Sequence, residues 1–320
     1  MFIASCAGKF LALDKSTGKV AWSYDTKADG GPFSFHGDPL LVRDLVIIPA
    51  DRGCGVEGYI YAFGRNTGGL RWKLAAGSPA TAFARADNAV IVGTRRDEWL
   101  SVNTKTGKLN WKFTDAAPDP SCDIPKPAAT DGTIVAFVSH DQVVHILNAK
   151  SGAELRKVAL SSPASTAPFL YKHLLYIGTA DGHLRTVDPA SGKTRDYQKL
   201  PEILIGRFTT VKTGGKDHEF VLGTRINDEH KTGMMVAFAD QFQHVTWERG
   251  AAGAWESEQP HLWKGWVIAG SCHGDIAAYR ASDGTFEWTE HVQGCIRSFG
   301  HDESTLYIGV QQGTVYAYRP

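Results

Sequence analysis

The sequence lacks the features that mark several large classes of protein. Its 34 Lys and Arg residues are balanced by 34 Asp and Glu residues, so the formal net charge is +0. Such a chain has no overall positive field to hold a nucleic-acid backbone. Its apolar runs, such as 45–50, have the length of a strand and are far shorter than the roughly 20 residues of a membrane helix. We therefore expect neither a nucleic-acid partner nor a membrane span.

The cysteines and the first residues also lack a familiar pattern. The 5 cysteines are odd in number and contain no Cys-x-x-Cys, which fits neither a dense disulfide framework nor a zinc ribbon, so we expect free thiols. No basic and then apolar segment precedes the first patterned residues, 1–5. The sequence as given predicts a cytoplasmic protein, and the alternative is a periplasmic protein whose targeting segment has been removed.

An internal repeat runs through the chain. Residues 8–22, GKFLALDKSTGKVAW, combine an apolar stretch, a Thr-Gly pair and a tryptophan. The same order recurs at 58–72, 99–111 and 276–288, more weakly at 145–152, 184–193 and 235–247, and in part at 313–318. Eight copies in 320 residues give about 40 residues for each copy, which is the size of a four-stranded propeller blade.

The residues of each repeat favour strands. Apolar and small side chains alternate, and the Ser/Thr-Gly pair that follows supplies the positive φ of a tight hairpin. The tryptophan can then bridge to the next repeat. We predict an all-β fold, a single β-propeller domain over 1–320 with eight four-stranded blades, or alternatively seven. Naming the strands A (innermost) to D (outermost), the N-terminus supplies B to D of one blade and the C-terminus supplies A to C of another.

One copy of the repeat matches a known motif in full. Residues 12–22 fit Ala-x-Asp-x-x-Thr-Gly-Lys-x-x-Trp, the tryptophan-docking motif, and the chain resembles the propellers built from PQQ-like repeats. That resemblance implies fold more than function, since the family includes quinone-dependent alcohol dehydrogenases and non-enzymatic assembly scaffolds. The quinone enzymes carry a longer propeller, two adjacent cysteines and a calcium-binding set. This sequence has no Cys-Cys pair, so a quinone cofactor is not expected, and any other cofactor or metal is unknown.

The expected scaffold gathers polar residues at one mouth of its channel. A strands line the channel, and the B-to-C and D-to-A connections emerge on one face, where binding groups usually lie. We aligned the A strands on a marker in the B strand, namely Pro49, Gly93, Phe137, Gly178, Gly223, Gly270 and Gly309. One position then holds Phe35, Pro79, Asp123, Ala164, Glu256 and Cys295, and the next on the same strand face holds Gly37, Thr81, Pro125, Thr166, Glu258 and Arg297, with Arg207 nearby.

Cysteines and histidines map to the same face. Cys6, Cys54 and Cys272 lie at B-to-C connections, and Cys122 and Cys295 lie where A strands begin. The same face receives His36, His140, His273, Arg95 and Trp255. These charges could simply pair with one another and with water, and Trp255 could simply pack.

Two functions are open for this set. The first is a binding or scaffold protein that takes a small polar ligand or a partner peptide, with Arg207, Arg297, His36, His140, Arg95 and Trp255 as the binding residues. The second is an enzyme, metal-dependent or not. It would use Cys295 or Cys272 as nucleophile or metal ligand, His273 or His140 as base, and Asp123, Glu256 and Glu258 as acid or base groups.

Overall fold

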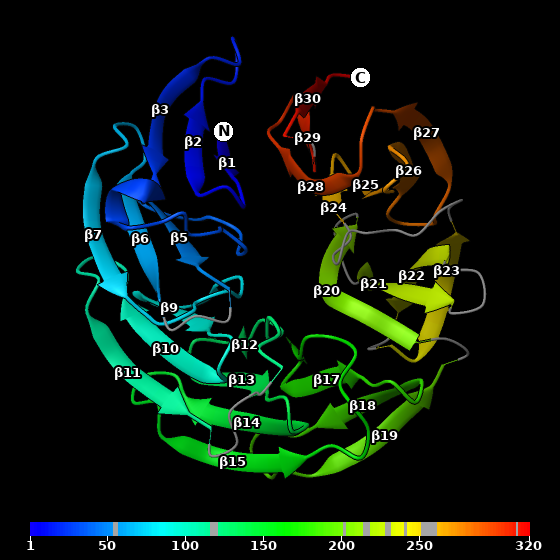
Figure 1. The fold of residues 1–320 in the computed structure, drawn as a ribbon. Helices are drawn as coiled ribbons and strands as arrows, with labels where there is room; N and C mark the ends of the chain where they lie inside the picture. The colour runs from blue at the N-terminus through cyan, green and yellow to red at the C-terminus, as the bar shows by residue number, and fades with distance from the viewer. Residues whose placement is uncertain are drawn as a thin grey trace. The chain divides into compact units, whose positions relative to one another are not determined.

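The computed structural model of the protein describes residues 1–53, 57–115, 121–200, 203–213, 218–227, 232–239, 242–250, 261–311 and 313–320. The chain forms two compact units, Met1–Ser161 with Pro189–Gly192 and Ser162–Asp188 with Lys193–Pro320. Each unit is a series of antiparallel sheets (Figure 1). The expectation of a single domain stays a prediction.

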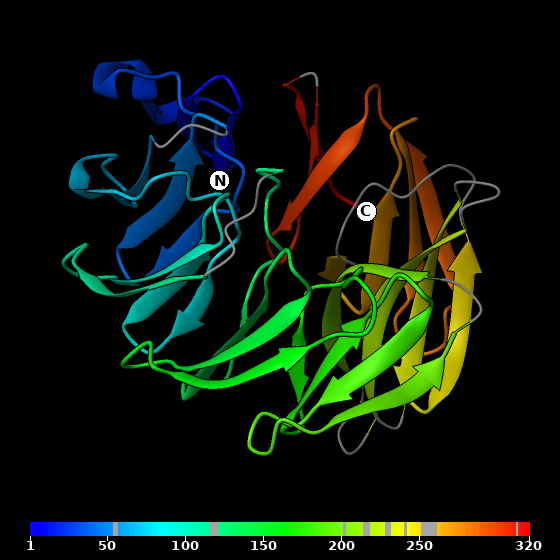
Figure 2. The same cartoon turned by 60° about the horizontal axis from the view of Figure 1, so that its bottom comes forward.

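The first unit holds four sheets, which follow one another in chain order (Figure 2). A 3-10 helix, η1 (Thr26–Asp29), follows the first of them. The sheets are β1 (Phe2–Ala4), β2 (Lys9–Leu13) and β3 (Val20–Asp25); β4 (Leu40–Val42), β5 (Leu45–Asp51), β6 (Gly58–Gly64) and β7 (Leu70–Ala75); β8 (Ala84–Ala86), β9 (Ala89–Gly93), β10 (Glu98–Asn103) and β11 (Leu109–Thr114); and β12 (Ala129–Thr130), β13 (Ile134–Val138), β14 (Val143–Asn148) and β15 (Glu154–Ala159).

The second unit also holds four sheets. They are β16 (Phe169–Tyr171), β17 (Leu174–Gly178), β18 (His183–Val187) and β19 (Thr194–Lys199); β20 (Ile203–Thr213), β21 (His218–Asn227), β22 (Thr232–Ala239) and β23 (His244–Gly250); β24 (His261–Trp263), β25 (Trp266–Gly270), β26 (Asp275–Arg280) and β27 (Phe286–His291); and β28 (Ile296–His301), β29 (Leu306–Val310) and β30 (Val315–Tyr318).

This arrangement confirms the predicted all-β propeller. Among the described residues there are eight sheets, which agrees with eight blades rather than the alternative of seven. The first sheet lacks its A strand and the last lacks its D strand, as the repeat pattern predicted. Among the described residues there is no helix that is long and apolar enough to span a membrane.

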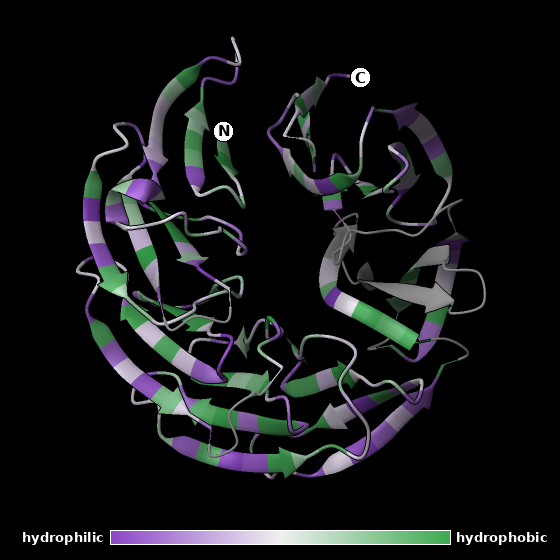
Figure 3. Ribbon diagram, viewed as in Figure 1, coloured by the Kyte–Doolittle hydropathy of each residue, from purple (hydrophilic) through white to green (hydrophobic). Residues whose placement is uncertain are grey.

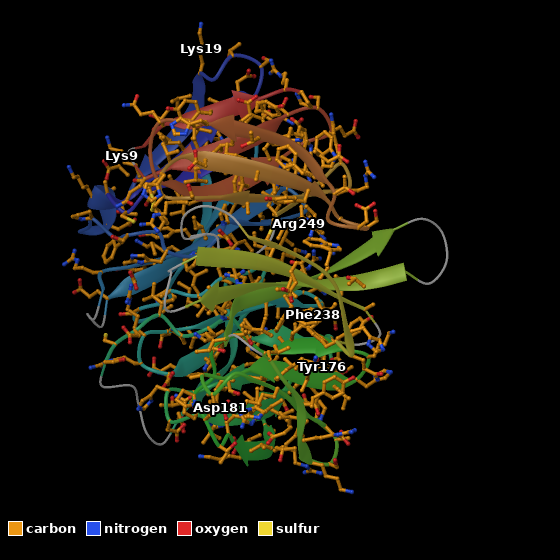
Figure 4. All side chains as sticks on the ribbon, turned by 90° about the vertical axis from the view of Figure 1, so that its right-hand side faces the viewer. Lys9, Lys19, Tyr176, Asp181, Phe238 and Arg249 are labelled. Atoms are coloured by element: carbon orange, nitrogen blue, oxygen red, sulfur yellow. A yellow bond between two sulfur atoms is a disulfide. The ribbon has the colours of Figure 1, made fainter. Side chains whose placement is uncertain are left out.

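Inner and outer strands differ in burial. The inner strand β13 is almost wholly buried and hydrophobic, whereas the outer strand β11 alternates between polar and apolar side chains (Figure 3). In the second unit, Tyr176 and Phe238 are fully buried (Figure 4), and both pack against the ring of Phe242. Apolar burial of this kind is the main favourable contribution to folding.

Four tryptophans on D strands, Trp22, Trp72, Trp111 and Trp247, dock onto the following sheet. Each indole N–H donates to a carbonyl just before the next turn, with N–O distances of 3.2 Å for Trp22 to Arg65, 3.0 Å for Trp72 to Thr104, 2.8 Å for Trp111 to Ala149 and 3.1 Å for Trp247 to Ala281. A Cβ added to the turn glycine beneath the ring would lie 2.6 or 2.7 Å from an indole carbon, which explains why Gly68, Gly107, Gly152 and Gly284 carry no side chain. At the equivalent position of β15, Arg156 replaces tryptophan and its Nη2 donates to the carbonyl of Ala190 at 2.9 Å.

Candidate functional site

The first unit presents one end of its sheets as a loop face. We define the loop face as the B-to-C turns after β1, β5, β9 and β13 together with the D-to-A connections after β3, β7 and β11. Hydrogen bonds between these connections show that they lie together. Ser34 Oγ donates to the carbonyl of Cys6 at 2.8 Å, and Ser34 pairs with Asp51 through the backbone.

A buried carboxylate organises this face. The Asp51 side chain, at the end of β5, is fully buried and accepts from His36 Nδ1 at 2.8 Å and from Arg95 Nε at 2.6 Å. Arg95 also donates from Nη1 to the carbonyl of Cys122 at 3.1 Å. We call His36, Asp51, Arg95 and the Cys122 carbonyl the Asp51 cluster.

The electrostatics of the Asp51 cluster favour its ionised form. Burial by itself would raise the pKa of the Asp51 carboxyl. The hydrogen bonds from His36 and Arg95 and the charges of these two groups outweigh burial and hold the pKa below its ordinary value. Asp51 is therefore a carboxylate that holds two sheets together.

A second carboxylate repeats this arrangement one sheet further on. Asp97, in the turn between β9 and β10, accepts from the backbone N–H of His140 at 3.2 Å, and its Oδ2 lies 2.8 Å from His140 Nδ1. Its side chain is only 3% exposed, whereas that of His140 is 32% exposed. His140 is thus anchored by the neighbouring sheet and still reaches the surface.

Three predicted binding residues, His36, Arg95 and His140, therefore lie on this face, each bonded to an internal carboxylate. Neither carboxylate is among the residues that the sequence pattern predicted for this face. A signal was present, since Asp51 stands two residues after the marker Pro49 and Asp97 lies in the B-to-C turn. Both carboxylates are important because they are buried, and the sequence does not show that these two aspartates are buried.

A pocket opens beside the Asp51 cluster. It has a volume of about 370 Å³ and is lined by Asp29, Gly30, Phe33, Arg52, Glu57, Gly58, Tyr59, Ala75 and Gly77. Arg52 Nη1 lies 3.2 Å from Glu57 Oε2, and the guanidinium carbon lies 4.8 Å from the centre of the Phe33 ring. The opposite charges of Arg52 and Glu57, which both line the pocket, thus pair with each other.

In the second unit the expectation of free cysteines is wrong for one pair. Cys272, in the turn between β25 and β26, forms a disulfide with Cys295, which precedes β28. Neither sulfur is then a thiolate, so neither can act as the nucleophile or metal ligand that the enzyme hypothesis required. The bond brings these two connections together, and the expectation that all five cysteines lie on one face stays a prediction. Cys6 is a free thiol, and Cys54 lies outside the described residues.

The other candidates are spread over both units. Asp123 is exposed and accepts from Ser121 Oγ at 3.1 Å, and Arg297 is exposed and donates to Gln311 Oε1 at 2.9 Å. His273 is exposed beside the disulfide, and Arg207 lies half-buried on β20. Trp255, Glu256 and Glu258 lie outside the described residues. Roles for these residues stay predictions.

Two features of the described residues argue against a quinone cofactor. Such a group would need cations for its carboxylates, and Arg95 is already bonded to buried Asp51. The disulfide joins cysteines 23 positions apart, rather than adjacent ones. The expectation that a quinone is absent rests on this donor set and stays a prediction.

Curated relatives fall into two groups. Over 186 residues the chain is 24% identical to the outer membrane protein assembly factor BamB of Legionella pneumophila, a match that covers 55% of this chain and 45% of that protein. Over 76 residues it is 36% identical to the quinohemoprotein alcohol dehydrogenase ADH IIB of Pseudomonas putida, covering 23% of this chain and 11% of that enzyme. The matches thus span less than half the length of either relative.

Solved structures agree on the fold. The crystal structure of BamB from Moraxella catarrhalis superposes with a TM-score of 0.72 at 17% identity, covering 100% of this chain and 93% of that one. The computationally designed Ika8 protein gives 0.74 at 17% identity. At such identity the likeness concerns the fold alone. The sequence pattern of one family matches residues 56–119 and 101–320, which is most of the chain. The chain therefore belongs to the PQQ-repeat family that is described as outer membrane protein assembly factor BamB.

Proposed function

We propose that the protein is a non-enzymatic scaffold that binds a protein or peptide partner on the loop face, in the assembly of outer-membrane proteins. The observation that carries this proposal is the family match over residues 56–119 and 101–320. The dehydrogenase relatives support a catalytic role less well, because their match covers only 23% of this chain.

The chemistry of the loop face supports a protein partner over a small anion. An anion clamp needs a guanidinium that is free to form two parallel bonds. Arg95 would have to leave the buried Asp51 to do so, at the cost of an unpaired buried charge. His140 offers instead a surface group with a fixed position, which suits contact with a folded or extended chain.

The disulfide supports the periplasm as the compartment. Disulfides persist in oxidising compartments, including the bacterial periplasm, and are rare in the cytosol. Cys272–Cys295 therefore favours the periplasmic alternative, and nothing found supports the cytoplasmic one.

Site-specific photo-crosslinking in the source organism tests the proposal. A photoreactive amino acid replaces the exposed Cys6 or Arg96 on the loop face, or the exposed Arg43 or Asp87 in A-to-B hairpins of the same unit as matched controls. We expect adducts with an envelope protein from the loop-face positions and none from the hairpin positions. Adducts from the hairpins alone, or from neither set, would overturn the proposed face.

A further inference from the structure

A histidine in the fourth sheet is surrounded by carboxylates. His145, on β14, is 1% exposed, and its Nδ1 lies 2.6 Å from Glu154 Oε1 on β15. Its Nε2 lies 3.3 Å from Oδ2 of Asp115, whose side chain is 2% exposed. Asp141 is the third group, and one ligand atom each from Asp115, Asp141 and His145 lie within 4.8 Å of one another.

We propose that Asp115, Asp141 and His145 form a binding site for a divalent first-row transition-metal ion, with Zn²⁺ as the reference ion. Two of these residues, Asp115 and Asp141, belong to connections of the loop face, and the proposed site does not depend on the proposed partner. Among the described residues this is the single group of three or more such side chains that are close enough to share an ion.

The separation of the two buried ligands suits such an ion. A tetrahedral ion with bonds of about 2.1 Å to nitrogen and oxygen holds its ligand atoms about 3.4 Å apart. His145 Nε2 and Asp115 Oδ2 are already 3.3 Å apart. Asp141 is exposed, so its carboxylate can move inward to become the third ligand, and water completes the coordination.

The surroundings of His145 fix which nitrogen binds the ion. Histidine ligands usually donate their second ring N–H to a carboxylate or carbonyl, which orients the ring. Glu154 accepts from Nδ1 here, which leaves Nε2 facing Asp115 Oδ2 at 3.3 Å and the Ser139 hydroxyl at 3.2 Å, so an ion at Nε2 would displace the contact with Ser139. The rings of Phe113 and Phe137 lie 5.1 and 5.2 Å from the imidazole and limit its rotation.

Charge also favours a cation at this position. Asp115, Asp141 and Glu154 surround one imidazole, and Lys157 Nζ approaches Asp115 Oδ1 only to 4.0 Å, from a half-exposed side chain. The mixed nitrogen and oxygen donors favour Zn²⁺ or Mn²⁺ over Ca²⁺ and Mg²⁺, which prefer oxygen alone.

The bound ion would connect three segments of the chain, which come from two successive sheets. Asp141 comes from the turn between β13 and β14, Asp115 from the connection after β11, and His145 from β14. Binding to the folded chain alone stabilises it. A rise in melting temperature is therefore expected in addition to uptake.

Metal uptake by the full chain tests the proposal. Metal-free protein is titrated with Zn²⁺, Co²⁺, Mn²⁺, Ca²⁺ and Mg²⁺ by calorimetry, and visible absorption bands report bound Co²⁺. We expect one Zn²⁺ per chain, and no Ca²⁺ or Mg²⁺ at the same concentrations. His145→Gln and Asp141→Asn should abolish uptake. Glu154→Gln should weaken it about 10- to 100-fold.

Two controls keep the test decisive. Asp141 is exposed, so Asp141→Asn should leave the melting temperature of the metal-free protein unchanged, which separates metal loss from misfolding. His183→Gln removes a histidine that faces Asp181 at 3.3 Å and should bind Zn²⁺ as the wild type does. The site would be overturned by the absence of saturable uptake in the wild type, by wild-type uptake in both Asp141→Asn and His145→Gln, or by a preference for Ca²⁺.

Discussion

At Asp51 one buried carboxylate holds two basic groups, one from its own sheet and one from the next. Replacing Asp51 with Asn would leave the Arg95 guanidinium, which is 13% exposed, without its counterion. Breaking a buried pair in this way costs about 3–5 kcal/mol of unfolding free energy. Urea denaturation of Asp51→Asn should show this loss. Asp123→Asn, at an exposed site, should stay within about 0.5 kcal/mol of the wild type.

The same residue predicts a dependence on acid. Because the pKa of Asp51 is lowered in the folded chain, its stabilisation is complete above the ordinary value of 3.8 and is lost as pH falls through the folded value. The unfolding free energy of the wild type should therefore fall below about pH 4. The Asp51→Asn variant should lose less over that range, and an equal loss in both proteins would contradict the assignment.

His261 predicts a second dependence of stability on pH. Here the group becomes positively charged when it is protonated, whereas Asp51 becomes neutral. Burial, and then the charge of His301, lower the pKa of His261 from 6.5 to about 4. The unfolded chain binds a proton there that the folded chain does not, so stability should fall as pH drops from about 6.5 to about 4. Denaturation at several pH values should show a shallower fall for His261→Gln.

At the scale of elements, alanine substitutions at two glycines can measure how much the docking of a tryptophan on the next turn contributes to stability. Gly107 and Gly18 occupy the same motif position with φ of +69° and +70°, but only Gly107 lies under a ring, that of Trp72. Alanine at either glycine costs about 1–2 kcal/mol for the left-handed backbone. Gly107→Ala should cost about 1–3 kcal/mol more, because its Cβ would meet the indole. Equal losses in thermal or urea unfolding would show that docking contributes nothing there.

The disulfide supports the connection between two sheets of the second unit. Cys272 and Cys295 close a loop over a separation of 23 residues, and removing such a crosslink costs about 3 kcal/mol. The double variant Cys272→Ser, Cys295→Ser should lose about this much by urea denaturation, and reductant should not destabilise it further. Cys6→Ser, which removes a free exposed thiol, is the matched control and should unfold like the wild type with and without reductant.

At the scale of the whole molecule, the repeat made the architecture predictable. Strands with alternating side chains, turn glycines and tryptophans are local features that recur along the chain. Their period therefore predicted the number of sheets and the incomplete first and last sheets. Contacts between repeats were not predictable in this way. Two contacts join residues from different repeats, namely Asp51 with Arg95 and Cys272 with Cys295. A periodic pattern does not predict which side chains of different repeats come into contact. Arg156 in place of a tryptophan shows the same limit, since an arginine in sequence gives no sign that it bonds Ala190.

The balance of charge predicts how the whole molecule behaves in solution. With a net charge of +0 and a sequence pI of about 7.2, electrostatic repulsion between molecules is weakest near neutral pH. Light scattering from pH 5 to 9 should therefore show the strongest self-attraction near pH 7. Lys9 and Lys19 are exposed and labelled in Figure 4. Changing both to Glu replaces positive by negative charge without touching the core, so the attraction maximum should move to lower pH. If it stays near neutrality, an apolar surface patch rather than charge controls association.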